Sequence, residues 1–179
     1  MSGSSSIETL DIHRFPTAVD RLAEILRCCV YEGASVGFVL PFSLEEARAY
    51  WLTKVAPAQR NGSRRVLVAR VGPTIAGSAQ IAYDDMPSKR HHAEVSKVLV
   101  DPTFRRHGLG RALMLEVERL AKSEARWLLT LDTAGEAAEA LYRSLGYTLA
   151  GEIPAYARDY RAPGKYDATR LFYKNLRSA

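Results

Sequence analysis

Val98-Leu99-Val100-Asp101-Pro102 is an apolar run that leads, through two further residues, into Arg105-Arg106-His107-Gly108-Leu109-Gly110. The first part predicts a strand and the residues after Gly110 predict a long amphipathic helix, so the two glycines lie at a strand-to-helix turn. The first amides of a helix have no partner within the helix, and they form a favourable site for a phosphate group. Glycine at positions 108 and 110 lets the backbone approach an anion without an intervening Cβ. A plain connecting turn is the alternative interpretation.

This turn differs from two well-known phosphate-binding loops. No Lys-Ser/Thr follows the second glycine, so it is not a P-loop. Leu113 stands where the dinucleotide-binding fingerprint would place its third glycine. The pattern that remains is Arg-x-x-Gly-x-Gly.

Composition limits the partners of the chain. Its 179 residues, with 47% hydrophobic and 25% charged residues, suit one globular domain. The net charge of +5 favours an anionic small molecule, and the scattered Lys and Arg residues do not indicate nucleic acid. We expect no membrane segment, because no apolar run approaches about 20 residues. The adjacent Cys28 and Cys29 and the four histidines predict neither a disulfide nor a metal site. The first six residues are polar and do not form a secretory signal peptide, so we expect a cytoplasmic protein.

Hydrophobic periodicity divides the chain into strands and helices. The expected strands are 7–13, 66–71, 75–83, 93–100, 127–132, 147–151 and 169–176, and the expected helices are 16–31, 43–55, 104–124 and 137–145. Ser43 and Glu46 have the spacing of a capping box, Gly146 is placed to end the last helix, and residues 154–168 are expected to form a loop. The order β-α-α-β-β-β-α-β-α-β-β predicts one mixed α/β domain with a parallel crossover in its middle.

The Arg-x-x-Gly-x-Gly turn resembles the pyrophosphate-binding motif of the GNAT N-acetyltransferases, and the element order is similar to their fold over nearly the whole chain. The resemblance implies a single GNAT domain, expected over residues 7–179 after a flexible tail over residues 1–6. It implies an enzyme that transfers an acetyl group from acetyl-CoA to a primary amine without a metal.

The resemblance also implies a catalytic base and a catalytic acid. Glu94 precedes Arg105 by the spacing of the strand-borne glutamate in histone-acetylating GNAT enzymes. A carboxylate in an otherwise apolar central strand should be desolvated, which makes it a stronger base. Transfer through ordered water, and an ion pair of Glu94 with Lys97 or Arg90, are the alternatives.

Tyr142 is the candidate acid. It lies in Ala-x-x-Leu-Tyr-x-x-x-Gly-Tyr over residues 138–147, which resembles the end of the GNAT core. In that family the tyrosine hydroxyl reaches the sulfur of coenzyme A. The alternative is that Tyr142 only packs against the sheet.

The cofactor contacts follow from the same resemblance. The backbone of residues 98–100 would pair with the pantetheine arm as a pseudo-strand, and the amides of residues 106–111 would surround the diphosphate. The family often has an asparagine where this chain has Gly135, so Asp132 or Thr133 is expected to take its place. The full set of cofactor-binding candidates is Val98, Leu99, Val100, Arg105, Arg106, His107, Gly108, Leu109, Gly110, Arg111, Thr133, Gly135 and Tyr142.

Four further blocks, residues 33–38, 93–95, 131–133 and 151–156, resemble the bacterial tabtoxin-resistance-type acetyltransferases. The resemblance implies a small, amino-acid-like acceptor amine, in the context of toxin or antibiotic detoxification. The acceptor-binding candidates are Val36, Gly37, Phe38, Glu94, Asp132 and Tyr156. The alternative is that the loops in these blocks only cover the fold and do not bind an acceptor.

Two other functions stay open at this point. A protein lysine or N-terminal acetyltransferase would need an acidic groove, and only Asp84-Asp85 lies near the expected entrance. A coenzyme-binding module without activity would keep the glycine turn and lose the base and acid. Homodimers are common in the family.

Overall fold

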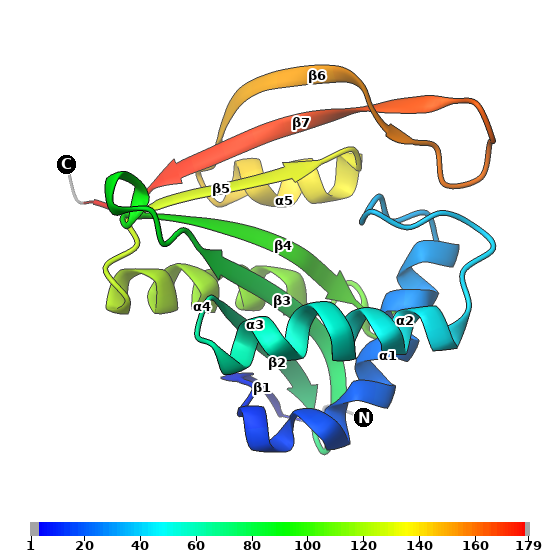
Figure 1. Cartoon of the computed structure of the whole chain (residues 1–179), viewed down its shortest axis with the longest axis horizontal. Helices are drawn as coiled ribbons and strands as arrows, with labels where there is room; N and C mark the ends of the chain where they lie inside the picture. Colours follow the sequence, from blue (N-terminus) through cyan, green and yellow to red (C-terminus); the bar gives the residue numbers. More distant parts are fainter. Residues whose placement is uncertain (1–3, 178–179) are drawn as a thin grey trace.

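One seven-stranded sheet, in the order β1-β2-β3-β4-β5-β7-β6, runs through the computed structural model, which describes residues 4–177 (Figure 1). The strands are β1 Ser5–Thr9, β2 Arg64–Val71, β3 Thr74–Tyr83, β4 His92–Val100, β5 Leu128–Thr133, β6 Thr148–Arg158 and β7 Tyr166–Asn175. The helices are α1 Phe15–Tyr31, α2 Leu44–Tyr50, α3 Ala56–Arg60, α4 Leu109–Ser123 and α5 Glu136–Ser144. The β4–β5 pair is parallel and the other neighbours are antiparallel, which confirms the predicted mixed sheet and its crossover.

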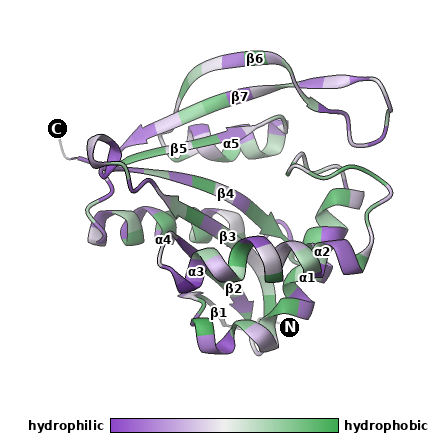
Figure 2. Cartoon of the chain, in the orientation of Figure 1, coloured by the Kyte–Doolittle hydropathy of each residue, from purple (hydrophilic) through white to green (hydrophobic). Residues whose placement is uncertain are grey.

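The two faces of the sheet carry separate cores. Side chains of successive strand residues point to opposite faces, so Val66 and Val68 pack under α1 and α2 while Leu67 and Ala69 pack with α4. The two clusters place hydrophobic side chains on both faces of the central strands. Hydrophobic and hydrophilic residues both occur along the ribbons of the strands and helices (Figure 2). Because both faces are covered there, the middle of the sheet is a fixed base for the loops at its edge.

The expected capping box at the start of α2 is confirmed. The Ser43 hydroxyl accepts a hydrogen bond from the Glu46 amide at 3.1 Å, and the Glu46 carboxylate accepts one from the Ser43 amide at 2.7 Å. The helical segment then changes character, because a π-helical turn at Trp51–Val55 separates α2 from α3. The fully buried Trp51 lies in this turn.

The long central helix is shorter than predicted. It begins at Leu109 rather than at 104, because Arg106 (φ 68°) and Gly108 (φ 78°) have left-handed backbone conformations that an α-helix does not accommodate. Pro102–Phe104 forms a separate 3-10 turn. The segment between strand and helix is therefore an exposed turn.

The predicted first strand also ends early. β1 stops at Thr9, because the Asp11 side chain accepts a hydrogen bond from the His13 amide and starts a 3-10 turn. Of the tail expected over residues 1–6, residues 1–3 lie outside the described part of the chain. Ser5 and Ser6 pair with β2.

The prediction of a loop over residues 154–168 is wrong for most of that range. β6 continues to Arg158 and β7 starts at Tyr166. Pro154 is tolerated because β6 is the edge strand, where a missing N–H costs no ladder hydrogen bond. The register shifts between Ile153 and Ala157, where Ala155 has φ 51°.

Candidate active site

The parallel strands β4 and β5 separate in the middle of the sheet. They pair from His92 to Glu94 on β4 and no further, although β4 continues to Val100 and β5 to Thr133 (Figure 1). The β5-facing edge of β4 beyond Glu94 therefore has no strand partner in the described chain. An extended ligand with amide groups, such as the pantetheine arm of coenzyme A, fits this gap as an added strand.

A β-bulge lies on β4 beyond the last residue that pairs with β5. The register against β3 passes from Ser78↔Leu99 to Gln80↔Ser96, so β4 contains one residue more than its partner. The extra residue is in the stretch that includes Lys97, whose φ of 50° is left-handed. A bulge bends the strand that carries it, and this one lies in the part of β4 that no longer pairs with β5.

The glycine turn at the end of β4 presents free backbone donors. Arg106 and Gly108 have positive φ, and no side chain caps the first turn of α4. The Ala112 amide bonds to the Gly108 carbonyl, so the amides of residues 109–111 precede the first helical hydrogen bond. Such a turn at a helix N-terminus fits the diphosphate of coenzyme A.

The two glycines of the turn differ in their backbone conformation and in what a Cβ would contact. A Cβ on Gly108 would meet no protein atom within 4 Å, so its φ of 78° is what requires glycine. A Cβ on Gly110 would lie 3.4 Å from Leu141 of α5. This is an ordinary van der Waals distance, so the space around position 110 does not by itself require glycine.

The arginines of the turn are only partly available to an anion. Arg105 donates to the Val100 carbonyl at 3.3 Å and lies 3.9 Å from the Glu32 carboxylate. Arg111 donates to the Ser144 hydroxyl at 3.1 Å. Arg106 and His107 are exposed, and Leu109 is a core residue that offers only its backbone.

Tyr142 lies at the floor of a cavity of about 330 Å³ between the separated strands. Its ring is 6% exposed and packs near Tyr147 and Phe172. Burial and, after it, the negative charge of Asp132 raise the pKa of Tyr142 to about 12. The hydroxyl is therefore protonated at neutral pH and available as a donor in the cavity.

Several predicted site residues line this same cavity. They are Val36, Gly37, Val98, Asp132, Thr133, Gly135, Tyr142 and Tyr156. Asp132 accepts a hydrogen bond from the Thr169 hydroxyl at 2.9 Å, and Thr133 accepts one from the Gly135 amide at 3.1 Å. The side chain of Thr133 is thus engaged in starting α5.

Glu94 is exposed, contrary to the buried setting expected for it. Its neighbours Ala93 and Val95 point into the core under α4, so the Glu94 side chain points to the other face of β4. No described cation lies within 4.0 Å of its carboxylate, so neither Lys97 nor Arg90 forms the alternative ion pair. Glu94 lines an adjoining cavity of about 370 Å³, which shares Asp132 and Tyr156 with the Tyr142 cavity.

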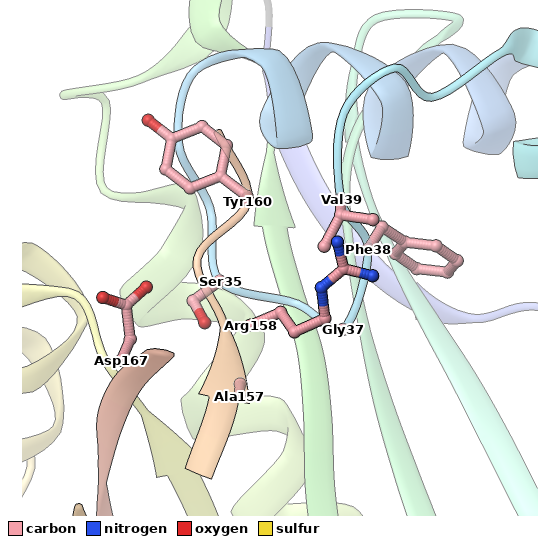
Figure 3. Close-up of a pocket in the computed structure, with 8 residues that line it drawn as sticks. All are labelled: Ser35, Gly37, Phe38, Val39, Ala157, Arg158, Tyr160 and Asp167. Atoms are coloured by element: carbon pink, nitrogen blue, oxygen red, sulfur yellow. The ribbon is translucent and has the colours of Figure 1, made fainter. Parts of the chain in front are cut away.

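The mouth of the site lies between the segment after α1 and the β6–β7 hairpin. The Leu40 amide donates to the Tyr160 carbonyl at 2.8 Å, and a Cβ on Gly33 would approach the Tyr160 hydroxyl to 2.7 Å. A hollow of about 250 Å³ lies between the two segments and is lined by Phe38 and Val39 of the first segment and Arg158 of the second (Figure 3). Phe38 therefore lies beside this hollow, next to the Tyr142 cavity.

The sequence analysis missed Lys97 as a site residue. It lines the Tyr142 cavity, and its ammonium lies 5.9 Å from the ring centroid of Phe38 and 5.6 Å from that of Tyr50. Burial lowers the pKa of Lys97, and the positive charge of Arg64 lowers it further. The sequence did contain a signal for Lys97, because it is a second charged residue, three positions after Glu94, in a strand predicted to be central.

Within residues 4–177, no three His, Cys, Asp or Glu side chains come together as metal ligands. Over the same residues, none of the helices combines the length and apolarity that a membrane span requires.

Comparison with known proteins bears on this arrangement. The model of the acetyltransferase (GNAT) family matches residues 20–147. An uncharacterized N-acetyltransferase from the hisH-hisA intergenic region of Azospirillum brasilense is 30% identical over 129 residues, which cover 71% of this chain and 70% of the relative.

Two solved structures share the fold. One is yncA of Salmonella typhimurium with its cofactor acetyl-CoA, with a TM-score of 0.75, 20% identity, and coverage of 98% of this chain and 95% of the other. The second is the ribosomal-protein-alanine N-acetyltransferase of Brucella melitensis, with a TM-score of 0.74, 26% identity, and coverage of 96% and 99%. The separated strands, the glycine turn and the family match agree: this chain belongs to the GNAT family and is an acetyltransferase.

Proposed function

We propose that the protein transfers the acetyl group of acetyl-CoA directly to the primary amine of a small, amino-acid-like molecule. The observation that carries the proposal is the gap between β4 and β5, which has the Tyr142 cavity between the strands and the uncapped start of α4 after the end of β4. The pantetheine arm would lie along residues 98–100 and the diphosphate at the amides of residues 108–111. Bound there, acetyl-CoA supplies an activated thioester.

The residues around the cavity have the properties that such a transfer requires. An alkyl amine with a pKa near 10.4 must lose a proton, which costs about 4.6 kcal/mol at pH 7. The exposed Glu94 carboxylate takes this proton, through water, before the amine attacks the thioester. As the C–S bond breaks, Tyr142 gives its hydroxyl proton to the sulfur, and the second proton that the nitrogen loses after the N–C bond forms returns to Tyr142. The protonated state of Tyr142 at neutral pH supports that role.

The acceptor side supports a small molecule. The two adjoining cavities, of about 330 and 370 Å³, have the size of small-ligand sites. The contact of the β6–β7 hairpin with Leu40 narrows the mouth above them. The resemblance of residues 33–38 and 151–156 to tabtoxin-resistance-type enzymes favours an amino-acid-like amine, with detoxification of a toxin or antibiotic as the context.

A protein N-terminus is the second candidate acceptor. One structural neighbour is named for acetylating an alanine of a ribosomal protein, and its identity to this chain is 26%. That acceptor would have to enter the same mouth as an extended peptide. The contact of the hairpin with Leu40 favours the smaller acceptor.

The test is release of free thiol from acetyl-CoA in the presence of amino acids, other small amines and peptides. We expect amine-dependent release and an N-acetylated product of a small amine. Transfer to peptides but to no small amine would replace the proposal with its alternative. Absence of release with every acceptor would contradict both.

A further inference from the structure

Two cations of the acceptor side lack an anionic partner. Lys97 and Arg64 are half-buried on the same region of the sheet, close enough for the charge of Arg64 to act on Lys97. Among the described residues, no carboxylate oxygen lies within 4.0 Å of either cation, whereas Lys89 and Lys174 both have such a partner. Arg64 bonds to the Gln80 side chain, and within residues 4–177 its Nε has no hydrogen-bond partner.

Aromatic rings hold the Lys97 ammonium at the cavity wall. Phe38 and Tyr50 form an edge-to-face pair with centroids 5.3 Å apart, and the ammonium lies within 6 Å of both. A cation–π contact offsets part of the cost of removing the ammonium from water without neutralising its charge. The cavity wall therefore keeps the positive charge of Lys97, which is available to bind an anion.

The face of β4 that carries Lys97 looks toward the acceptor and away from the diphosphate turn. Val95 and Val98 pack in the core under α4, whereas Phe38 and Tyr50 belong to the opposite core. The diphosphate turn lies beyond the end of the strand, at residues 105–108. Lys97 thus approaches whatever occupies the cavity from the side of the acceptor loop.

Two carboxylates lie around the same space. Asp132 of β5 lines the same cavity as Lys97, and Glu94, three residues before Lys97 on β4, lines the adjoining one. Both carboxylates are near enough to act on the charge of Lys97, although neither pairs with it. The two adjoining cavities therefore carry both positive and negative charge.

We infer that the acceptor is an amino acid whose carboxylate binds Lys97, with Arg64 behind it, while its amine points to Asp132 and Glu94. This inference rests on the proposed function and adds Lys97 as the specificity-determining residue for a carboxylate. A charge-assisted hydrogen bond to a half-buried ammonium is worth about a 10- to 100-fold preference in kcat/KM.

The experiment compares each amino acid with the amine that lacks its carboxylate, with kcat/KM expressed per unprotonated amine. The wild type should favour the amino acids by at least about tenfold. Lys97→Met keeps the side-chain length and removes the charge, so the preference should fall to about threefold or less, through KM. Lys97→Arg should retain it. Lys122→Met, on the exposed side of α4, is the matched control and should change nothing.

A wild type without this preference, or a Lys97→Met enzyme that loses kcat equally with both acceptor types, would overturn the inference. A calorimetric comparison of N-acetylated amino acids with N-acetylated amines needs no turnover. Tighter, Lys97-dependent binding of the carboxylates supports the site even if acetyl transfer is never observed. Equal binding of the two ligands would contradict the carboxylate site at Lys97. It would not bear on the proposed acetyl transfer, which the thiol assay tests separately.

Discussion

Tyr142 and Glu94 are the two side chains on which the proposed chemistry depends. They lie in adjoining cavities joined by Asp132 and Tyr156 rather than in one pocket. Their settings also differ, because Tyr142 is buried and Glu94 is exposed. A buried acid and a hydrated base suit a reaction in which the amine proton leaves through water.

Replacement of Tyr142 by phenylalanine removes the acid and keeps the ring packing. We expect kcat to fall by about 10²–10⁴ with little change in thermal stability. Tyr147→Phe is the matched control, because Tyr147 is equally buried and adjacent but does not line the cavity. If both variants keep wild-type kcat, Tyr142 has only a packing role.

The pH dependence of kcat tests the same hydroxyl. Burial, with a contribution from Asp132, raises the pKa of Tyr142 to about 12, so the proton it donates is lost only as the pH rises through that range. The kcat of the wild type should therefore show no alkaline decline between pH 8 and about pH 10, where an ordinary tyrosine starts to ionise. A decline centred near pH 10 would show that Tyr142 is in an ordinary environment or that another group limits the rate.

Glu94→Gln removes the proposed base. At pH 7 kcat should fall by about 10²–10⁴, and the loss should shrink at alkaline pH, where more of the amine is already unprotonated. Glu45→Gln, on an exposed residue of α2, controls for loss of a surface carboxylate. A loss that stays constant with pH would argue that Glu94 binds the acceptor instead of taking its proton.

At the scale of elements, the turn before α4 is held from the opposite side of the sheet. Asp101 accepts hydrogen bonds from the Thr103 amide at 2.8 Å and the Thr103 hydroxyl at 2.7 Å, and it pairs with Arg21 of α1. The Arg21 Nε also donates to the Ile75 carbonyl at 2.9 Å. The pair therefore connects α1 and β3 to the start of the diphosphate turn.

Asp101→Asn should weaken both the fold and coenzyme binding. Breaking a buried ion pair costs about 3 kcal/mol, or about 6–12 °C in Tm for a domain of this size. Displacement of the turn should also raise the KM for acetyl-CoA. Asp20→Asn, which breaks the exposed Asp20–Arg48 pair, should cost less than about 1 kcal/mol.

The pH dependence of this stability has a defined sign. Burial alone would raise the pKa of Asp101, but the hydrogen bonds from Thr103 and Arg21 outweigh it and lower the pKa. The contribution is therefore present above the unfolded pKa of about 3.9 and is lost as the pH falls through the lower folded value. The Tm difference between wild type and Asp101→Asn should narrow below about pH 4. A difference that widens there would contradict this account of the pair.

Gly108→Ala tests the backbone of the turn itself. The left-handed φ should cost about 1–2 kcal/mol and should raise the KM for acetyl-CoA. Gly151→Ala is the control, because a Cβ there also meets no protein atom within 4 Å and its φ is not left-handed. Equal effects of the two substitutions would show that the conformation of Gly108 does not matter.

At the scale of the whole molecule, local signals predicted most of the fold. The capping box at Ser43, the apolar runs of β2 and β3, and the glycine turn each act over a few residues, and the structure confirms their positions. Features set by tertiary contacts were not predictable in this way. The continuation of β6 through Pro154 depends on its place at the sheet edge, and the bulge at Lys97 depends on pairing with β3.

The same distinction applies to the site. The turn and Tyr142 carry sequence motifs, so both could be proposed as site residues from the sequence. The exposure of Glu94 and the partnerless charge of Lys97 depend on where β5 leaves β4 and on which loop faces the cavity. A strand pattern read along one chain does not contain that information, because it concerns neighbours far away in sequence.

The most direct test of the central claim is a crystal structure of the protein with acetyl-CoA. The pantetheine arm should lie between β4 and β5, the diphosphate should accept hydrogen bonds from the amides of residues 108–111, and the thioester should lie beside the Tyr142 hydroxyl. A coenzyme bound on another surface, or one whose thioester lies away from the Tyr142 cavity, would contradict the account.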